Sequence, residues 1–386
     1  MNTNDKLWSK DFICITLCNL FIYLVFYYLL VTLPIYIIEH IAGGEIIAGM
    51  ITTVFLFIAI IVRTLTPLWI SRFGNKSILY AGLIVYLVSS VLYLFPTTGI
   101  GFLVVRMLHG IGFGLATATT GEFLTDIIPQ SRKGEGIGFY TLSLNLAVVF
   151  GPFFGINAVR NLEKPYFFGI VILFSFLSII MCVFLSNTER EQQPENPGVN
   201  SRDVFEKSAV RISIICAAFA IVYSSILSFI PVYALDIGLL HVSSYFFIVF
   251  AIVTIISRPF TGKWMDVYGA NVIMYPSIIL FALGILLLSL SYNSAIFLIA
   301  AALIGLGWGT LFPTFQTLAI SKALPEKRGM AMATFLSIFE LGIGIGSYIV
   351  GVVISIYSFQ TVYLHGSVLV VMGGVLYWLL VHRKEA

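Results

Sequence analysis

The sequence predicts an all-α membrane protein with twelve transmembrane helices arranged in two six-helix bundles. Three observations support this fold class: an apolar composition, a regular succession of apolar segments and an internal repeat. Of the 386 residues, 59% are hydrophobic and 10% are charged, and the mean hydropathy is +1.01. Soluble domains carry about 25% charged residues. Because so few charges cannot cover a water-facing surface of this size, we expect lipid to solvate most of the molecule.

The apolar segments are long enough to cross a bilayer. A hydrocarbon core about 30 Å thick needs roughly 20 apolar residues per helix. The first segment has no small-residue cleavage site before Pro34, so we expect it to be retained as a span. The predicted spans are residues 12–33, 46–70, 77–96, 99–125, 136–158, 166–186, 210–233, 243–265, 272–291, 295–320, 331–354 and 362–381.

A polar stretch divides the chain after the sixth span. It runs from Asn187 to Ser208 and includes a charged, proline-bearing run that begins at Thr188. This composition is typical of a flexible linker. We therefore expect an N-terminal six-helix bundle at residues 1–187, a cytoplasmic linker at 188–207 and a C-terminal six-helix bundle at 208–386.

The basic residues indicate the orientation in the membrane. Most of the 21 Lys and Arg residues fall at the termini and in the even-numbered loops, whereas the odd-numbered loops contain only Arg160 and Lys164. Cytoplasmic loops of membrane proteins are enriched in Lys and Arg. The sequence therefore predicts a multi-pass protein of the cell membrane, surrounded by lipid, with both termini in the cytoplasm.

A constant offset of 195 residues relates the two halves. Arg63 matches Arg258 at this offset, and Gly74 matches Gly269. Because each half has an even number of spans, the two halves share one membrane orientation, and parallel repeats of this kind place a substrate site near the midplane between them. Further matches are Gly110 with Gly305, Gly112 with Gly307, Gly114 with Gly309, Gly134 with Gly329 and Gly151 with Gly346.

The remaining polar residues argue against several function classes. The four cysteines lie inside apolar runs and the five histidines are scattered, so neither type forms a metal-binding pattern. No glycine-rich loop ends in Gly-Lys-Ser or Gly-Lys-Thr, which argues against a nucleotide-driven pump. We expect a monomer that moves a small-molecule substrate and a proton, without a cofactor, nucleic acid or enzymatic activity.

Two loops of the repeat are similar to one another. They follow the second and eighth spans, and they resemble the Gly-x-x-x-Asp-Arg-x-Gly-Arg-Lys loop of the major facilitator superfamily. The first copy has Pro67 and Ser71 at the Gly and Asp positions, and the second has Val267 at the Arg position. The resemblance implies the twelve-span major facilitator fold and a gating role for both loops. The matching residues are Arg72, Gly74 and Lys76 in the first copy and Gly262, Asp266 and Gly269 in the second.

The fourth and fifth spans resemble those of the drug–proton antiporters of that superfamily. In the fifth span, Gly151, Pro152 and Gly155 match a Gly-x-x-x-Gly-Pro-x-x-Gly element of exporters, with Ala147 at its first position. Small residues let helices approach closely, and proline bends a helix. In the fourth span, Arg106 matches a basic residue of the same group. The resemblance implies efflux.

The resemblance also implies that spans 1, 4, 7 and 10 line a central cavity. These spans carry most of the polar and aromatic groups at mid-depth. Aromatic rings with polar edges favour an amphiphilic organic substrate, and Arg106 adds a preference for an anionic or zwitterionic group. The candidate cavity residues are Asn19, Tyr23, Tyr27, Arg106, His109, Thr117, Tyr223, Ser224, Ser228, Phe312 and Gln316.

An ionisable residue inside a span is a candidate for function. Glu340 lies about 13–15 Å into the eleventh span, near the midplane, by the rise of about 1.5 Å per helical residue. The resemblance places spans 2 and 11 together, so we expect Arg63 to face Glu340 and the pair to handle the coupled proton. Glu122 and Asp126 of span 4 are the next candidates, and the basic residues of the first similar loop are their expected partners in a cytoplasmic latch.

The sequence thus predicts a secondary transporter of a small amphiphilic compound or metabolite that works by alternating access. Proton-coupled efflux is the main interpretation. An importer or facilitator of the same fold is the first alternative. A membrane-embedded enzyme or a receptor is an alternative from another class, and it would require clustered catalytic groups or ligands, whereas the five histidines are scattered.

Overall fold

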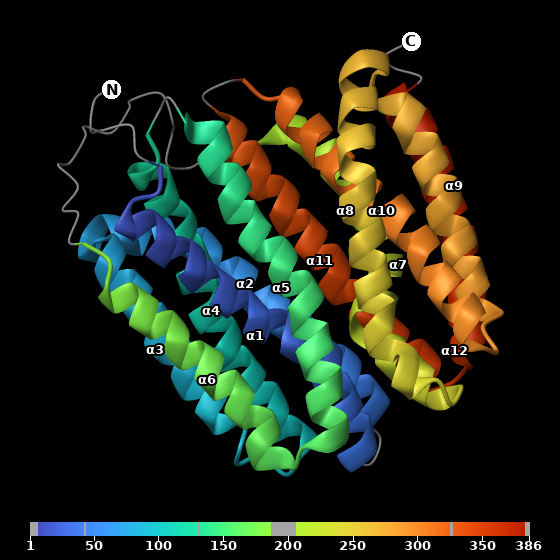
Figure 1. Ribbon diagram of the computed structural model, residues 1–386, viewed down its shortest axis with the longest axis horizontal. Helices are drawn as coiled ribbons and strands as arrows, with labels where there is room; N and C mark the ends of the chain where they lie inside the picture. Colours follow the sequence, from blue (N-terminus) through green and yellow to red (C-terminus); the bar gives the residue numbers. More distant parts are fainter. Residues whose placement is uncertain (1–6, 42–43, 130–131, 187–205, 325–326, 383–386) are drawn as a thin grey trace. The chain divides into compact units, whose positions relative to one another are not determined.

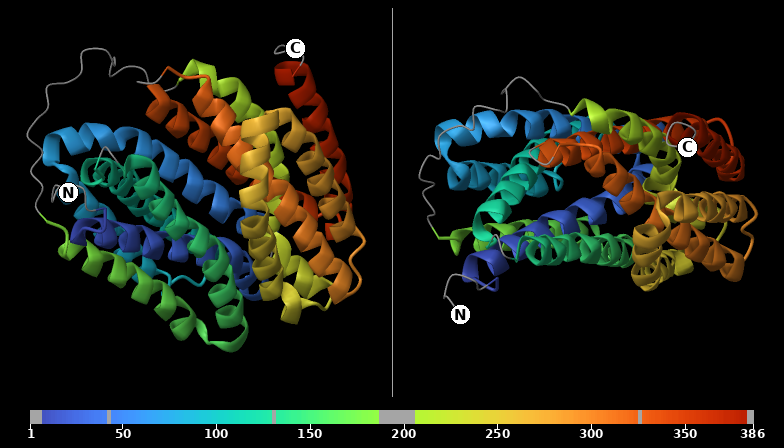
Figure 2. Two further views of the ribbon diagram at one scale, coloured as in Figure 1. Left: turned by 45° about the horizontal axis from the view of Figure 1, so that its top comes forward. Right: turned by 90° about the horizontal axis from the view of Figure 1, so that it is seen from above.

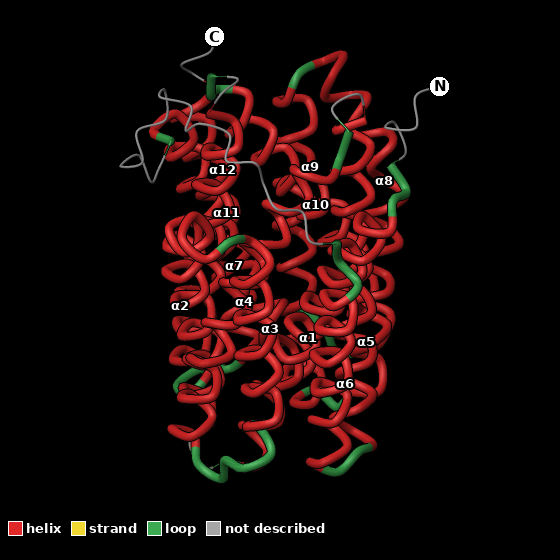
Figure 3. The backbone as a smooth tube through the Cα atoms, turned by 90° about the vertical axis from the view of Figure 1, so that its left-hand side faces the viewer, coloured by secondary structure: helices red, strands yellow, loops and turns green. Residues whose placement is uncertain are grey.

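The computed structural model describes residues 7–41, 44–129, 132–186, 206–324 and 327–382, and every regular element within them is helical (Figures 1 and 3). The 3-10 turn η3 (Leu240–Val242) precedes α8, and the π turn η5 (Trp378–His382) follows α12. The long helices of this part of the chain are α1 (Lys10–His40), α2 (Gly44–Phe73), α3 (Asn75–Leu92), α4 (Gly99–Ile127), α5 (Lys133–Asn161), α6 (Lys164–Val183), α7 (Lys207–Asp236), α8 (Ser243–Tyr268), α9 (Ala270–Ser289), α10 (Ser294–Ser321), α11 (Arg328–Ile354) and α12 (Phe359–Tyr377).

Twelve helices of the described residues are long and apolar enough to cross a membrane, which confirms the predicted number of spans. Several helices extend beyond those spans, whereas α3 ends before residue 96 and α6 before residue 186. The first runs from Lys10 to His40 rather than over residues 12–33, because hydropathy marks the lipid-facing core whereas backbone hydrogen bonding continues beyond it. At its start, Ser9 Oγ accepts a hydrogen bond from the Phe12 amide at 3.1 Å and caps the helix.

The chain divides into two compact units. Unit 1 comprises Met1–Gly44 and Val54–Gly198, and unit 2 comprises Glu45–Thr53 and Val199–Ala386, so that the first turns of α2 group with unit 2. The predicted linker at 188–207 lies outside the described residues except for Glu206 and Lys207. The predicted domain boundaries therefore stay a prediction.

The helices of each unit pack in corresponding ways (Figures 1 and 2). In unit 1, α1 packs against α4, α5 and α6, and α3 packs against α4 and α6. In unit 2, α7 packs against α10, α11 and α12, and α9 packs against α10 and α12. Each unit is thus a bundle in which a long buried first helix, α1 or α7, contacts several others.

Glycine contacts repeat between the units at the predicted offset. A Cβ atom on Gly110 would lie 2.7 Å from the Phe55 carbonyl oxygen, and one on Gly305 would lie 2.6 Å from the Phe250 carbonyl oxygen. These distances are too short for any side chain, so glycine is required where α4 meets α2 and where α10 meets α8. The same offset relates two further contacts, Gly112 on Tyr86 to Gly307 on Phe281 and Gly114 on Ala59 to Gly309 on Thr254.

Candidate functional site

The two similar loops have the same backbone turn. Gly74 ends α2 with φ of 81°, and Gly269 ends α8 with φ of 83°. Residues with a Cβ rarely adopt this left-handed region, which explains the glycine in both copies. Arg72 is exposed, with its guanidinium 5.3 Å from the Phe73 ring, and Lys76 Nζ donates to the Leu185 carbonyl at 2.6 Å.

The second loop is described only in part. The backbone of Gly262 and Asp266 lies in α8, but the side chain of Asp266 is outside the described residues. In α4, Glu122 is half-buried and Asp126 is exposed. The cytoplasmic latch between the acids of α4 and the basic loop residues therefore remains a prediction.

The span-5 element packs α5 closely on α1. A Cβ atom on Gly151 would lie 2.7 Å from Tyr27 Cβ, and one on Gly155 would lie 2.7 Å from Thr32 Cγ2. Pro152 is buried inside the helix between these contacts. The element thus has a clear packing role in unit 1.

Asn19 is part of a buried polar network that joins α1, α4 and α5. Its Nδ2 donates to Ser143 Oγ at 3.0 Å, and its Oδ1 accepts from the Tyr140 hydroxyl at 2.8 Å. The Tyr140 oxygen also lies 3.0 Å from Thr120 Oγ1. Both ends of the Asn19 amide have partners, so in this conformation the residue joins helices.

Three phenylalanines form an aromatic cluster in unit 1. Phe26, Phe55 and Phe113 come from α1, α2 and α4, and their ring centroids are 5.0–5.5 Å apart. Two predicted cavity residues border this cluster: the Tyr23 ring is 5.4 Å from Phe113, and the Tyr27 ring is 4.9 Å from Phe26. Tyr23 and Tyr27 are half-buried, so the cluster has a partly accessible edge with polar groups.

Arg106 and His109 lie beside this cluster and are both fully buried. The Arg106 guanidinium is 4.5 Å from the Phe55 ring centroid, which is a cation–π distance. Arg106 Nη1 lies 3.5 Å from His109 Nδ1, and the hydroxyl of Tyr93, the residue that follows α3, lies 3.3 Å from the same nitrogen. The imidazole also stacks on Tyr86 at 4.1 Å. The side chains thus form a polar cluster inside unit 1.

Arg63 of α2 is half-buried near the same cluster. Its Nη2 donates to Thr117 Oγ1 at 3.3 Å, and its guanidinium lies 5.9 Å from the Phe113 ring. Thr117 also donates to the Phe113 carbonyl at 2.8 Å. Two of the predicted site residues, Arg63 and Thr117, are therefore in contact.

Unit 2 contains an aromatic cluster at the corresponding place. The Tyr223 ring of α7 stacks on Trp308 of α10 at 4.3 Å and lies 6.2 Å from Phe250 of α8. The predicted cavity residue Phe312 extends the cluster, with its ring 4.7 Å from Phe339 of α11. Unit 2 thus contains a mostly buried aromatic cluster that includes the polar groups of Tyr223 and Trp308.

The other predicted residues of unit 2 have short-range partners. Ser347 Oγ donates to Ser228 Oγ at 3.1 Å, and Gln316 Nε2 lies 3.0 Å from Met332 Sδ. Ser224 Oγ donates within α7 to Ile221, and a Cβ on Gly346 of α11 would lie 2.5 Å from that oxygen. These contacts join α7 to α11 and α10 to α11.

Glu340 follows Phe339 in α11 and is half-buried. It is the thirteenth residue of the helix, about 18 Å from its start by the helical rise. A carboxylate so far inside a membrane helix is costly and is a candidate for function. Its counterpart in the repeat is Asn145, whose side chain lies outside the described residues.

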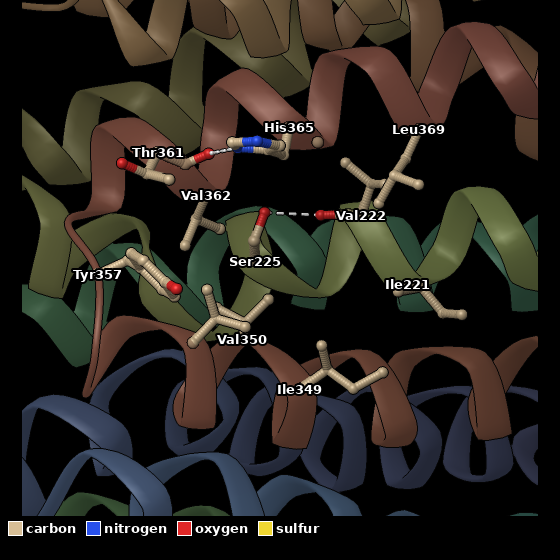
Figure 4. Close-up of a pocket in the computed structure, with 12 residues that line it drawn as sticks. Ile221, Val222, Ser225, Ile349, Val350, Tyr357, Thr361, Val362, His365 and Leu369 are labelled. Atoms are coloured by element: carbon tan, nitrogen blue, oxygen red, sulfur yellow. Dashed lines mark hydrogen bonds between the residues drawn. The ribbon is translucent and has the colours of Figure 1, made fainter.

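A groove of about 470 Å³ lies within unit 2 between α7, α11 and α12 (Figure 4). Its lining is mainly aliphatic. The Ser225 hydroxyl donates to the Val222 carbonyl at 2.6 Å, and His365 Nδ1 lies 2.9 Å from the Thr361 carbonyl, so both bonds stay within their own helices. The groove therefore offers apolar contact with few directional polar groups.

Sequence reasoning missed the residues that complete these clusters. Tyr93 lies directly after α3, and the partners of Tyr223 are Trp308 and Phe250. The repeat offset was the available signal, since Phe55 and Phe113 match Phe250 and Trp308 at 195 residues. Within the described residues, no group of three or more His, Cys, Asp or Glu side chains is placed to hold a metal ion.

Comparisons with known proteins agree on one family. The model of the Major Facilitator Superfamily matches residues 15–323 and 241–386. The chain is 25% identical over 346 residues to the staphylopine export protein of Staphylococcus aureus, covering 84% of this chain and 85% of that protein. It is 26% identical over 164 residues to multidrug resistance protein 1 of Bacillus subtilis, covering 42% and 41%. The crystal structure of the nucleoside transporter NupG has the same fold, with a TM-score of 0.72 and 13% identity, covering 96% of this chain and 99% of that one.

Proposed function

Because the chain belongs to the major facilitator superfamily of membrane transporters, we propose that it exports a small amphiphilic organic compound by alternating access, driven by protons. The observation that carries the proposal is the pair of aromatic clusters, Phe26–Phe55–Phe113 in unit 1 and Tyr223–Phe250–Trp308 in unit 2. Each cluster joins the first, second and fourth helices of its unit. Tyr23 and Tyr27 border the first cluster, and Tyr223 and Trp308 belong to the second. Rings with polar groups at equivalent places suit a compound that has an apolar body and polar groups.

The direction of transport is proposed from two features. One relative that aligns over most of the chain, the staphylopine export protein, is named as an export protein. The Gly151-Pro152 element, which resembles that of exporters, packs α5 on α1 beside Tyr27. We also propose that both termini are cytoplasmic, since the basic residues concentrate in the loops on that side.

Proton coupling is proposed to depend on Glu340. A charged carboxylate inside a span loses hydration, so it favours conformations that provide water or a cation, whereas the protonated form tolerates an apolar setting. Arg63 is the proposed cation, and Glu122 and Asp126 are the next acids to consider. A carboxyl group that alternates between these settings would tie proton uptake to the change of conformation.

The first experiment measures direction. Everted vesicles that contain the protein are energised and tested for uptake of a panel of amphiphilic compounds, and right-side-out vesicles are tested in parallel. Accumulation in everted vesicles supports export. Accumulation only in right-side-out vesicles would support the alternative of an importer of the same fold.

The second experiment tests coupling in proteoliposomes with an imposed pH gradient. We expect Glu340→Gln to lose gradient-driven accumulation and to keep substrate exchange, because an amide cannot carry the proton. Glu39→Gln, at the exposed end of α1, is the matched control and should behave as the wild type. Gradient-driven accumulation in Glu340→Gln would remove Glu340 from the mechanism.

A further inference from the structure

Three buried donor atoms around Arg106 have no hydrogen-bond partner among the residues that the structure describes. They are Arg106 Nε, Arg106 Nη2 and His109 Nε2, and both side chains have an exposed fraction of 0%. Native proteins satisfy the large majority of their buried polar atoms, and an unpaired buried cation is strongly destabilising. Three such atoms on two side chains one helical turn apart therefore form an open set of donors that a polar group from outside the chain can complete.

The arrangement of the Arg106 donors indicates what kind of group fits them. Nη1 of the guanidinium is directed at His109 Nδ1, which leaves the Nε and Nη2 edge. Two parallel N–H groups on one edge of arginine match the two oxygens of a carboxylate.

The histidine tautomer supplies a third donor. Arginine has no acceptor atom, so His109 Nδ1 must accept from Arg106, and it also lies within reach of the Tyr93 hydroxyl. The ring hydrogen of the neutral imidazole is therefore on Nε2, the atom that has no partner. Tyr93 acts here as a positioning residue, because its hydroxyl contacts the same imidazole nitrogen and so helps to orient the ring.

The fold itself does not require these residues. At the offset of 195, Arg106 corresponds to Ala301, His109 to Ile304 and Tyr93 to Leu288, and all three residues of unit 2 are fully buried. The glycine contacts around them are nevertheless the same in both units. Apolar residues fill these positions where only packing is needed, so the polar set of unit 1 serves another purpose.

We propose that Arg106 and His109 form a receptor for a carboxylate group on the transported compound. The inference rests on the proposed function and deepens it by naming the substrate class: carboxylates attached to an apolar, preferably aromatic, body. The body would contact the Phe26, Phe55 and Phe113 cluster, of which the Phe55 ring adjoins Arg106. Since the donors are fully buried here, binding requires a conformation in which these rings separate.

The test measures binding independently of transport. Thermal unfolding of the purified protein is followed with two matched pairs, 2-naphthylacetate with 2-naphthylacetamide and indole-3-acetate with indole-3-acetamide. We expect the carboxylates to raise the unfolding temperature more than the amides do, since a ligand that binds the native state stabilises it. Arg106→Lys should weaken carboxylate binding about 10-fold or more, because one ammonium cannot replace the two-point contact.

Two further variants separate the proposed roles. His109→Gln keeps an amide donor and should retain part of the preference for carboxylate over amide ligands. His109→Leu should lose this preference. Tyr93→Phe should weaken carboxylate binding only a few-fold, since it removes one of the two hydrogen bonds that orient the imidazole. Arg160→Lys, an exposed arginine at the end of α5, is the matched control and should leave both pairs unchanged.

A structural role for Arg106 makes the opposite prediction. If Arg106 and His109 bind a ligand, Arg106→Met should raise the unfolding temperature of the ligand-free protein. The same variant should abolish the difference between the unfolding temperatures measured with the carboxylates and with the amides. A lower unfolding temperature in Arg106→Met, together with an unchanged carboxylate effect, would overturn the receptor. The absence of a carboxylate-specific shift for both pairs in the wild type would also overturn it.

These outcomes are distinguishable from failure of the proposed function. If no compound accumulates in vesicles of either orientation but the purified protein still discriminates carboxylates from amides, the transport proposal fails and the receptor stands. If compounds accumulate and the discrimination is absent, the receptor fails and the transport proposal stands.

Discussion

Units 1 and 2 share a packing plan but differ in where they carry charge. Both bring glycines of the fourth helix of the unit against the second and third, and both build an aromatic cluster from the first, second and fourth helices. Unit 1 adds the buried Arg106, whereas unit 2 has Ala301 at that position and has Glu340 where unit 1 has Asn145. The repeated residues thus account for the scaffold, and the unrepeated charges are the candidates for substrate recognition and coupling.

The largest expected effect comes from introducing an arginine into unit 2 at the position that corresponds to Arg106. Ala301→Arg would bury a guanidinium where Ile304 and Leu288 offer no polar partner. We expect a loss of stability of about 3–5 kcal/mol, comparable to leaving a buried charge without its partner, measured as the unfolding temperature and the yield of folded protein. Ala301→Leu is the control for added volume, and an equal loss in both variants would show that charge is irrelevant there.

A second prediction tests whether the shared scaffold is equally strict in both units. A Cβ on Gly112 would lie 2.6 Å from the Tyr86 amide nitrogen, and one on Gly307 would lie 2.5 Å from the Phe281 amide nitrogen. We expect Gly112→Ala and Gly307→Ala each to cost about 1–3 kcal/mol, because the helices must separate. Thermal unfolding in detergent would measure both.

Gly169 of α6 is the matched control for these two variants, since nothing lies within 4 Å of its ideal Cβ position. Gly169→Ala should be neutral or stabilising, by up to about 1 kcal/mol, because alanine is the better helix former. Comparable destabilisation of all three variants would contradict the close-approach argument.

A third prediction concerns the cytoplasmic latch. Asp126→Asn should shift the population that is open to the cytoplasm, although by little, since partly exposed ion pairs are worth only about 0–1 kcal/mol each. Cysteine-accessibility labelling of the cytoplasmic side would report the shift. Unchanged labelling in both Asp126→Asn and Glu122→Gln would remove the latch.

The smallest effect is expected at Glu206, the residue before α7. Hydrogen bonds from the Ser208 hydroxyl and amide, and the nearby Lys327 ammonium at 3.9 Å, lower the pKa of the Glu206 carboxyl below its usual 4.5. A lowered folded-state pKa adds stability that is present above pH 4.5 and is lost as the pH falls through the folded value. Glu206→Gln should therefore reduce the fall of the unfolding temperature as the pH is lowered through that acidic range. An unchanged fall would show that other acidic residues cause it.

Part of the site could be anticipated from sequence because helical periodicity places residues three or four apart on one face. Arg106 and His109 could be grouped in this way, and the repeat offset could align Phe55 and Phe113 with Phe250 and Trp308. The contact of Tyr93 with His109 could not be anticipated from the sequence, since it depends on how α3 packs beside α4. The missing hydrogen-bond partners of Arg106 likewise appear only when every neighbouring helix is in place.

The sequence by itself determined the number of membrane helices and the internal repeat, because lipid requires about 20 apolar residues per span and duplicated packing preserves glycines at a constant spacing. The tertiary structure decided which polar groups have partners. Hydrogen bonding depends on distances of about 3 Å between helices that are remote in sequence. For that reason both ends of the Asn19 amide have partners on neighbouring helices, whereas Arg106, which is equally buried, has two donor atoms without a partner among the described residues.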